Sequence, residues 1–234
     1  MRVAAIGDLH CRTTSQGEMR RLLDGVDDQA EVLLLAGDLT NLGLTEEMQV
    51  LLDDLGHLQV PKIAVTGNHD HEMDQSERLV AMMREAGVTV LDADVVEVGG
   101  VGFAGTKGFC GGFDGQRLQP FGERLIKDFI HASVREVERF EQALAALDAP
   151  RRVALLHYSP ISATLHGEHP EIYPFLGFSL LAEALDRHGV DVAVHGHSHY
   201  GSLEGITPGG IPVHNVSHYV RRRHGKSAYA VFDV

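Results

Sequence analysis

Three histidines at alternating positions, His195, His197 and His199, directly follow the apolar segment VDVAV. Imidazole rings are costly to crowd together, because each ring nitrogen needs a hydrogen-bond partner and two protonated rings repel each other. A bound cation would remove this cost, since neutral imidazole is a common metal ligand. The spacing therefore indicates a metal site at the end of this segment.

Four other apolar segments also end in polar residues that can bind a metal ion. They are RVAAI followed by Gly7-Asp8-Leu9-His10, EVLLLA followed by Gly37-Asp38-Leu39-Thr40, KIAVT followed by Gly67-Asn68-His69-Asp70, and RRVALL followed by His157. Carboxylate, amide and imidazole donors without a thiolate suit Mn, Fe, Zn or related divalent ions. Each motif alone could be a turn, and a lone His157 could be a hydrogen-bonded core residue. All five in this order favour a metal centre.

The apolar segments have the composition of strands buried on both faces, since Val, Ile, Leu and Ala recur in them without polar alternation. Apolar residues at i, i+3 and i+4 follow the first three segments and predict helices over residues 19–26, 48–55 and 79–83. This alternation predicts a layered α/β fold. The carboxyl ends of parallel strands lie along one edge of a sheet, so the polar residues would converge there.

Further elements follow from local signals. Thr45 and Ser76, each followed by glutamate, have the residue type of helix N-caps. A helix over 180–185 is closed by Gly189, and the SAYAVFDV segment predicts a strand. Glycine and proline predict irregular loops at 105–115 and 166–175. A long helix over 123–147 is expected to face the core with Ile126, Phe129, Ile130, Val137, Phe140 and Leu144.

Length and composition limit the class of protein. A chain of 234 residues can bury most of its apolar surface, and we expect one domain over 1–234. Cys11 and Cys110 are too few for a disulfide framework. No signal peptide or run of transmembrane length is recognisable, so we expect a cytoplasmic protein without a membrane partner. The formal charge of −13 argues against broad nucleic-acid binding.

The ordered series DxH, GD, GNHD, H and GHxH resembles the calcineurin-like metallophosphoesterase superfamily, and the match runs from Asp8 to His199. The resemblance implies a four-layer α/β/β/α sandwich of two mixed sheets with flanking helices. It also implies two divalent metal ions, with Mn, Fe or Zn as candidates. The implied ligands are Asp8, His10 and His199 for the first ion, Asn68, His157 and His197 for the second, and Asp38 as the bridge.

Two such ions can share a water molecule and lower its pKa, so we expect a metal-bridging hydroxide to attack the phosphorus. The resemblance places His69 beside a ligand but outside the metal sphere, where it would act as general acid towards the leaving group. Asp70 could orient the His69 ring, or could serve only as a turn or cap residue. Arg12 and Asn68 are the candidate substrate-binding residues, although Arg12 could also be an ordinary surface side chain.

The pattern is closest to small bacterial phosphodiesterases, including class III cyclic nucleotide phosphodiesterases. Leu42 and Asp70 stand where the protein phosphatases of the superfamily carry Arg and Glu, and Asn41 stands where purple acid phosphatases carry Tyr. We therefore expect hydrolysis of a small phosphodiester. A phosphomonoesterase and a non-catalytic, metal-stabilised binding scaffold are the alternatives. The oligomeric state and the roles of His195, Cys11, Lys107 and the Arg221–Arg223 run stay open.

Overall fold

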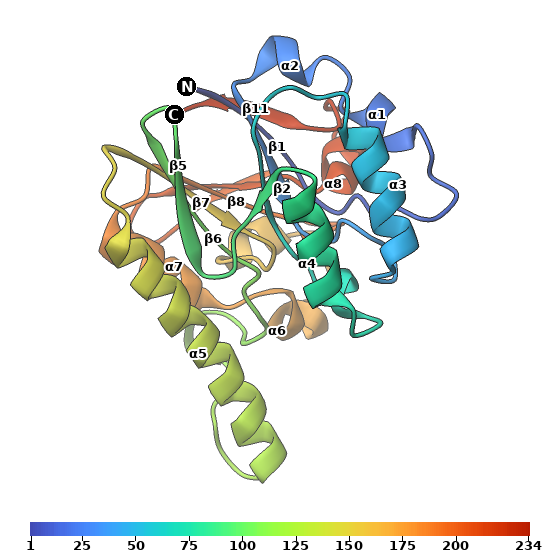
Figure 1. Ribbon diagram of the computed structural model, residues 1–234. Coiled ribbons are helices and arrows are strands. Elements are labelled where there is room, and N and C mark those ends of the chain that lie inside the picture. Colours follow the sequence, from blue (N-terminus) through green and yellow to red (C-terminus); the bar gives the residue numbers. More distant parts are fainter.

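The strands near the start of the chain are buried on both faces, and their side chains alternate between two separate cores. In β1 (Arg2–Ile6), Val3 and Ala5 belong to one core, whereas Ala4 and Ile6 belong to another. The computed structural model describes residues 1–234 and shows the reason for this pattern. The first core lies between two sheets, and the second lies under a layer of helices (Figure 1).

The two sheets are both mixed. The first has the order β11 (Ala230–Asp233), β1, β2 (Val32–Ala36), β3 (Lys62–Val65) and β4 (Val88–Val90), with only β11 antiparallel to its neighbour. The second has the order β5 (Asp94–Val98), β6 (Val101–Thr106), β7 (Arg151–Leu156), β8 (Val192–His195), β10 (Pro212–Asn215) and β9 (Glu204–Ile206). Its two edge strands, β5 and β9, are antiparallel to their neighbours.

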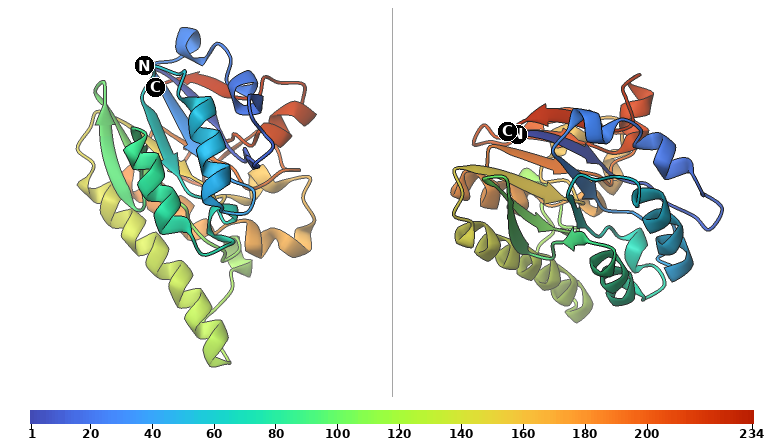
Figure 2. Two further views of the ribbon diagram at one scale, coloured as in Figure 1. Left: turned by 45° about the vertical axis from the view of Figure 1, so that its right-hand side comes forward. Right: turned by 45° about the horizontal axis from the view of Figure 1, so that its top comes forward.

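Helices cover the outer face of each sheet, as Figures 1 and 2 show. The first sheet carries α1 (Glu18–Leu22), α2 (Val26–Gln29), α3 (Thr45–Leu55) and α4 (Ser76–Glu85), which share one core with it. The second sheet packs against α5 (Arg124–Ala146) and α7 (Ser179–His188). Two short helices, α6 (Tyr173–Leu176) and α8 (His218–Arg223), lie in connections. The expected four-layer sandwich is confirmed.

The long helix was placed within a residue at each end, but part of its predicted buried face is wrong. Ile126 is 47% exposed and Phe129 is only partly buried, whereas Ile130, Val137 and Phe140 are in the interior. Figures 1 and 2 show why, because the amino-terminal end of α5 extends beyond the rest of the molecule. No helix in the chain is both long enough and apolar enough to span a membrane.

Three other local predictions need correction. Thr45 and Ser76 are the first helical residues rather than N-caps, and neither helix has a side-chain cap bond. At α3, Glu47 instead reaches back, and its Oε2 accepts the N–H of Leu42 at 2.7 Å. The predicted loop 105–115 begins too early, because Gly105 belongs to β6. A β-carbon at Gly105 would lie 2.8 Å from the Leu91 side chain, so glycine permits close packing there.

Candidate metal centre

The seven candidate ligands all follow the carboxyl ends of parallel strands. They are Asp8 and His10 after β1, Asp38 after β2, Asn68 after β3, His157 after β7, and His197 and His199 after β8. Four have positive φ angles, namely Asp8 at 60°, His10 at 43°, Asp38 at 49° and His197 at 68°. Residues other than glycine rarely adopt this conformation, and it concentrates at functional sites. The surrounding fold therefore holds these side chains in place at a conformational cost.

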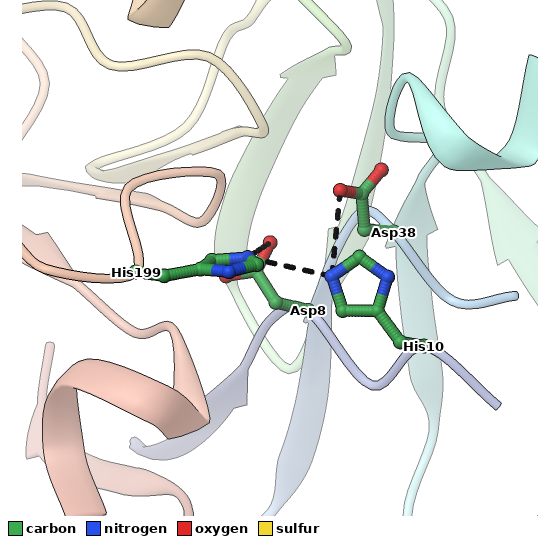
Figure 3. Close-up of side chains that lie close together, drawn as sticks. All are labelled: Asp8, His10, Asp38 and His199. Atoms are coloured by element: carbon green, nitrogen blue, oxygen red, sulfur yellow. Dashed lines mark hydrogen bonds and ion pairs between the residues drawn. The ribbon is translucent and has the colours of Figure 1, made fainter. Parts of the chain in front are cut away.

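The first group consists of Asp8, His10, Asp38 and His199, whose donor atoms all lie within 4.8 Å of one another. Their imidazoles and carboxylates converge on one point in Figure 3. The Nε2 atoms of His10 and His199 are 3.3 Å apart. Asp8 Oδ1 lies 3.6 Å from His199 Nε2, and Asp38 Oδ2 lies 3.8 Å from His10 Nε2. This geometry brings together the ligands expected for the first ion.

The second group consists of Asp38, His157 and His197, whose donor atoms also lie within 4.8 Å of one another. Asn68 joins it, because its Oδ1 is 3.0 Å from His157 Nε2. Asp38 Oδ1 lies 3.3 Å from the same nitrogen. Asp38 thus presents one oxygen to each group, which is the position expected of a bridging ligand.

Hydrogen bonds behind the two groups orient the imidazole rings. His157 Nδ1 donates to Ala36 O at 2.9 Å, which leaves Nε2 free as an acceptor or ligand. His197 Nε2 donates to Phe175 O at 3.1 Å, which leaves Nδ1 free. Metal-binding histidines commonly donate their second N–H to a carbonyl in this way.

The carboxylates are crowded in the interior. Burial, followed by the charges of Asp8 and Asp70, raises the pKa of Asp38 to about 9. Burial also acts to raise the pKa of Asp8, but a hydrogen bond and the charge of His199 outweigh it and lower that pKa well below its usual value. The raised pKa of Asp38 shows that the positive charge near it is insufficient, and a bound divalent cation would supply more.

The imidazoles complement these carboxylates. Burial lowers the pKa of His10 to about 4 and, likewise, that of His197 to about 4. Both rings are therefore neutral near pH 7, the form in which histidine binds metal. Nitrogen and oxygen donors, the neutral rings of His10 and His197 and the crowded carboxylates together fit a pair of divalent cations.

Glycines next to the ligands leave room for them. Gly37 has a φ of +79°, and a β-carbon there would lie 2.5 Å from His157 Nδ1. A β-carbon on Gly67 would overlap Asp38 Oδ1. The glycines before the ligands therefore serve both the turn and the close approach of neighbouring strand ends.

His69 lies beside the first group. Its ring centroid is 4.4 Å from that of His10, in an edge-to-face arrangement. Nδ1 donates to Asn41 O at 2.7 Å, and His69 N–H donates to Asp38 Oδ1 at 2.8 Å. The ring is therefore oriented by a backbone carbonyl, with Nε2 as the nitrogen available to a ligand.

The prediction that Asp70 orients this ring is corrected by the structure. Asp70 is fully buried, and its carboxylate accepts hydrogen bonds from Leu39 N, Thr40 N, Thr40 Oγ1 and Gly67 N at 3.2, 2.8, 2.6 and 2.8 Å. These bonds join the turn after β2 to the turn after β3. Asp70 is thus a turn residue that holds two ligand-bearing loops together, as the alternative interpretation stated.

Two clefts open beside the first group. The first, of about 660 Å³, is lined by His10, Asn41, His69, His199, Tyr200, Tyr219, Arg222 and Arg223. The second, of about 580 Å³, contains Arg12 and shares His10, Tyr219 and Arg222 with the first. Sequence reasoning missed Tyr200 and Tyr219, and no local pattern in the sequence singles them out.

The structure shows the surroundings of three residues whose roles the sequence left open. His195 is buried away from the ligands, where its Nε2 lies 2.8 Å from Thr164 Oγ1. Cys11 is buried in the core under the first helical layer, and burial raises the pKa of its thiol to about 12. The ammonium of Lys107 lies 5.2 Å from the centre of the Tyr158 ring, and burial lowers its pKa. Of these three, none belongs to either donor group.

Fold and site together define a class of protein, and the sequence agrees with it. The chain belongs to the calcineurin-like phosphoesterase family, whose profile it matches over residues 1–201. No curated protein matches it.

Several solved structures share the fold. Phosphopantetheinyl hydrolase from Mycobacterium tuberculosis is 20% identical, with a TM-score of 0.65 over 98% of this chain and 95% of that chain. GAP50, the anchor in the inner membrane complex of Plasmodium, is 12% identical, with a TM-score of 0.61 over 94% of this chain and 72% of that chain. TT1561 of Thermus thermophilus is 13% identical, with a TM-score of 0.58 over 99% and 98% of the two chains.

Proposed function

We propose that the protein is a binuclear metal-dependent phosphoesterase that hydrolyses a small phosphodiester. The observation that carries the proposal is the pair of donor groups sharing Asp38, with His69 beside them. The first ion would be held by Asp8, His10, Asp38 and His199, and the second by Asp38, Asn68, His157 and His197. Bound divalent ions would activate water and neutralise charge on the phosphoryl oxygens. Mn, Fe and Zn suit this donor set.

His69 would protonate the leaving oxygen. The Asn41 carbonyl accepts a hydrogen bond from Nδ1 at 2.7 Å, so the proton on Nε2 is the one that can be transferred to the leaving oxygen. The same carbonyl keeps the ring oriented during and after the transfer. A positioned acid of this kind matters most when the departing alkoxide is strongly basic.

The shape of the site supports a diester over a monoester. A phosphomonoester carries one organic substituent on the phosphoryl group, whereas a phosphodiester carries two. The two clefts share the lining residues His10, Tyr219 and Arg222, and each is large enough for one organic substituent. Arg12 lines the second cleft and is placed to contact an organic substituent or a phosphoryl oxygen of the substrate there.

The test compares hydrolysis of bis-p-nitrophenyl phosphate and p-nitrophenyl phosphate by metal-stripped protein, before and after addition of Mn²⁺. We expect Mn²⁺-dependent turnover that is faster on the diester. Asp38→Asn should abolish it, while the exposed Asp148→Asn provides a control with the same charge change. Faster turnover of the monoester would make the protein a phosphomonoesterase. Stoichiometric metal binding without turnover of either compound would make it a binding scaffold.

A further inference from the structure

One wall of the 660 Å³ cleft carries cationic side chains that have no acidic partner. Arg222 and Arg223 are both exposed, at the carboxyl end of α8. Neither guanidinium forms an ion pair or a side-chain hydrogen bond in the structure. The preceding Arg221 differs, because its Nε donates to Ser227 O at 2.9 Å. In a chain with a net charge of −13, two uncommitted guanidiniums beside the reacting groups indicate an anionic ligand.

Aromatic rings complete this wall. The guanidinium of Arg223 lies 4.5 Å from the centre of the Tyr200 ring. The Tyr219 ring stacks on His199 at 4.6 Å, with an interplanar angle of 28°. The rings restrict the positions of the charged groups and supply apolar surface between the cations and the candidate metal ligands.

The segment that carries these arginines is tied to the metal centre. Gly7, which precedes the ligand Asp8, donates its N–H to Val216 O at 2.9 Å and accepts the N–H of His218 at 3.2 Å. Val220 anchors α8 in the interior. The position of Arg222 and Arg223 relative to the first donor group is therefore set by the fold rather than by a free loop.

We propose that Arg222 and Arg223 bind a second phosphate of the substrate, so that the substrate is a phosphodiester carrying a further phosphate group. This inference rests on the proposed function. A guanidinium binds phosphate through paired N–H donors, and a terminal phosphate has charge and oxygens enough for two such groups. The cleft volume of about 660 Å³ lies in the range of small-molecule sites, which suits a ligand of nucleotide size.

A matched pair of chromogenic diesters tests the subsite in protein supplied with Mn²⁺. One is the p-nitrophenyl ester of thymidine 5′-phosphate, and the other is the same compound with an added 3′-phosphate. We expect kcat/KM to be at least about tenfold higher for the compound with the added phosphate. Arg222→Gln and Arg223→Gln should each reduce this ratio, and the double variant should bring it close to one. Arg135→Gln, which removes an exposed charge from α5, should leave the ratio unchanged.

Binding provides a second readout that does not depend on turnover. Calorimetry with thymidine 3′,5′-bisphosphate and thymidine 5′-phosphate should show at least about tenfold tighter binding of the bisphosphate, lost in the double variant. Equal binding of the two nucleotides, or a kcat/KM ratio that the arginine variants do not change, would overturn the subsite. Absence of turnover with every diester would overturn the proposed function instead, while the binding ratio would still decide the subsite.

Discussion

Replacing Asp70 with alanine removes the acceptor of four buried hydrogen bonds. The donors are the N–H groups of Leu39, Thr40 and Gly67 and the hydroxyl of Thr40, at 2.6 to 3.2 Å. A buried donor without a partner costs about 1–3 kcal/mol, and the hydroxyl can rotate to relieve part of the loss. We therefore expect Asp70→Ala to lower the free energy of unfolding by about 4 kcal/mol, a large part of a typical total.

The measurement is urea unfolding of the metal-free protein, followed by circular dichroism, with the exposed Asp148→Ala as the control. Metal affinity should fall as well, because the lost bonds connect the loops that carry Asp38 and Asn68. The dependence of kcat on the leaving group should not change, since Asn41 orients the His69 ring. A stability loss below about 1 kcal/mol would refute the reasoning. So would a change in leaving-group dependence like that of a His69 variant.

Three other perturbations have defined outcomes. His69→Ala should lower kcat on alkyl diesters by about 10² to 10⁴, and far less on p-nitrophenyl diesters, whose leaving group needs no proton. Burial lowers the pKa of His195 to about 4 from 6.5, so the unfolded chain takes up the proton first as pH falls. The stability that neutral His195 contributes is fully present above pH 6.5 and is lost as the pH falls to 4. The loss in the free energy of unfolding is about 3 kcal/mol, and it is measured by urea unfolding in the presence of a chelator. Gly37→Ala should displace His157 and lower the metal stoichiometry measured by elemental analysis.

Each of these has a control and a contrary result. For His69, equal losses on both kinds of diester would exclude the acid role. For His195, a His195→Gln variant should lose less stability on acidification than the wild type, and identical losses would contradict the pKa argument. For Gly37, the control is Gly87→Ala. Gly87 also has a positive φ, of +81°, but an added β-carbon there would meet open space. An unchanged stoichiometry in Gly37→Ala would show that the ring can move aside.

The fold could be predicted in outline because its signals are local. Five buried segments form strands, and the long amphipathic helix was placed within a residue at each end. Short elements such as β4 and β9 were missed, since three residues carry too little periodicity to be recognised. The exposure of Ile126 was also missed, because an apolar stripe does not show where the body of the protein ends.

The candidate site, like the fold, was predictable from the sequence only in part. Order and spacing of the motifs were enough to name the groups that meet around Asp38, because parallel strand ends converge at one sheet edge. By contrast, the ring of His69 is oriented by Asn41, and Asp70 binds backbone groups of another turn. The adjacency of His69 and Asp70 in the sequence suggested instead that Asp70 orients the His69 ring. That inference failed because adjacency does not determine side-chain direction in a tight turn.

The sequence by itself determined the donor groups of the candidate metal centre, because metal ligands must be specific side-chain types at the ends of specific strands. Only the tertiary structure decided what surrounds that centre. Arg222 and Tyr219 lie more than 200 residues from Asp8 along the chain, and a helix turn after the second sheet carries them to the cleft beside it. Such long-range proximity depends on how two sheets and their connections pack, and no local pattern of residues encodes it.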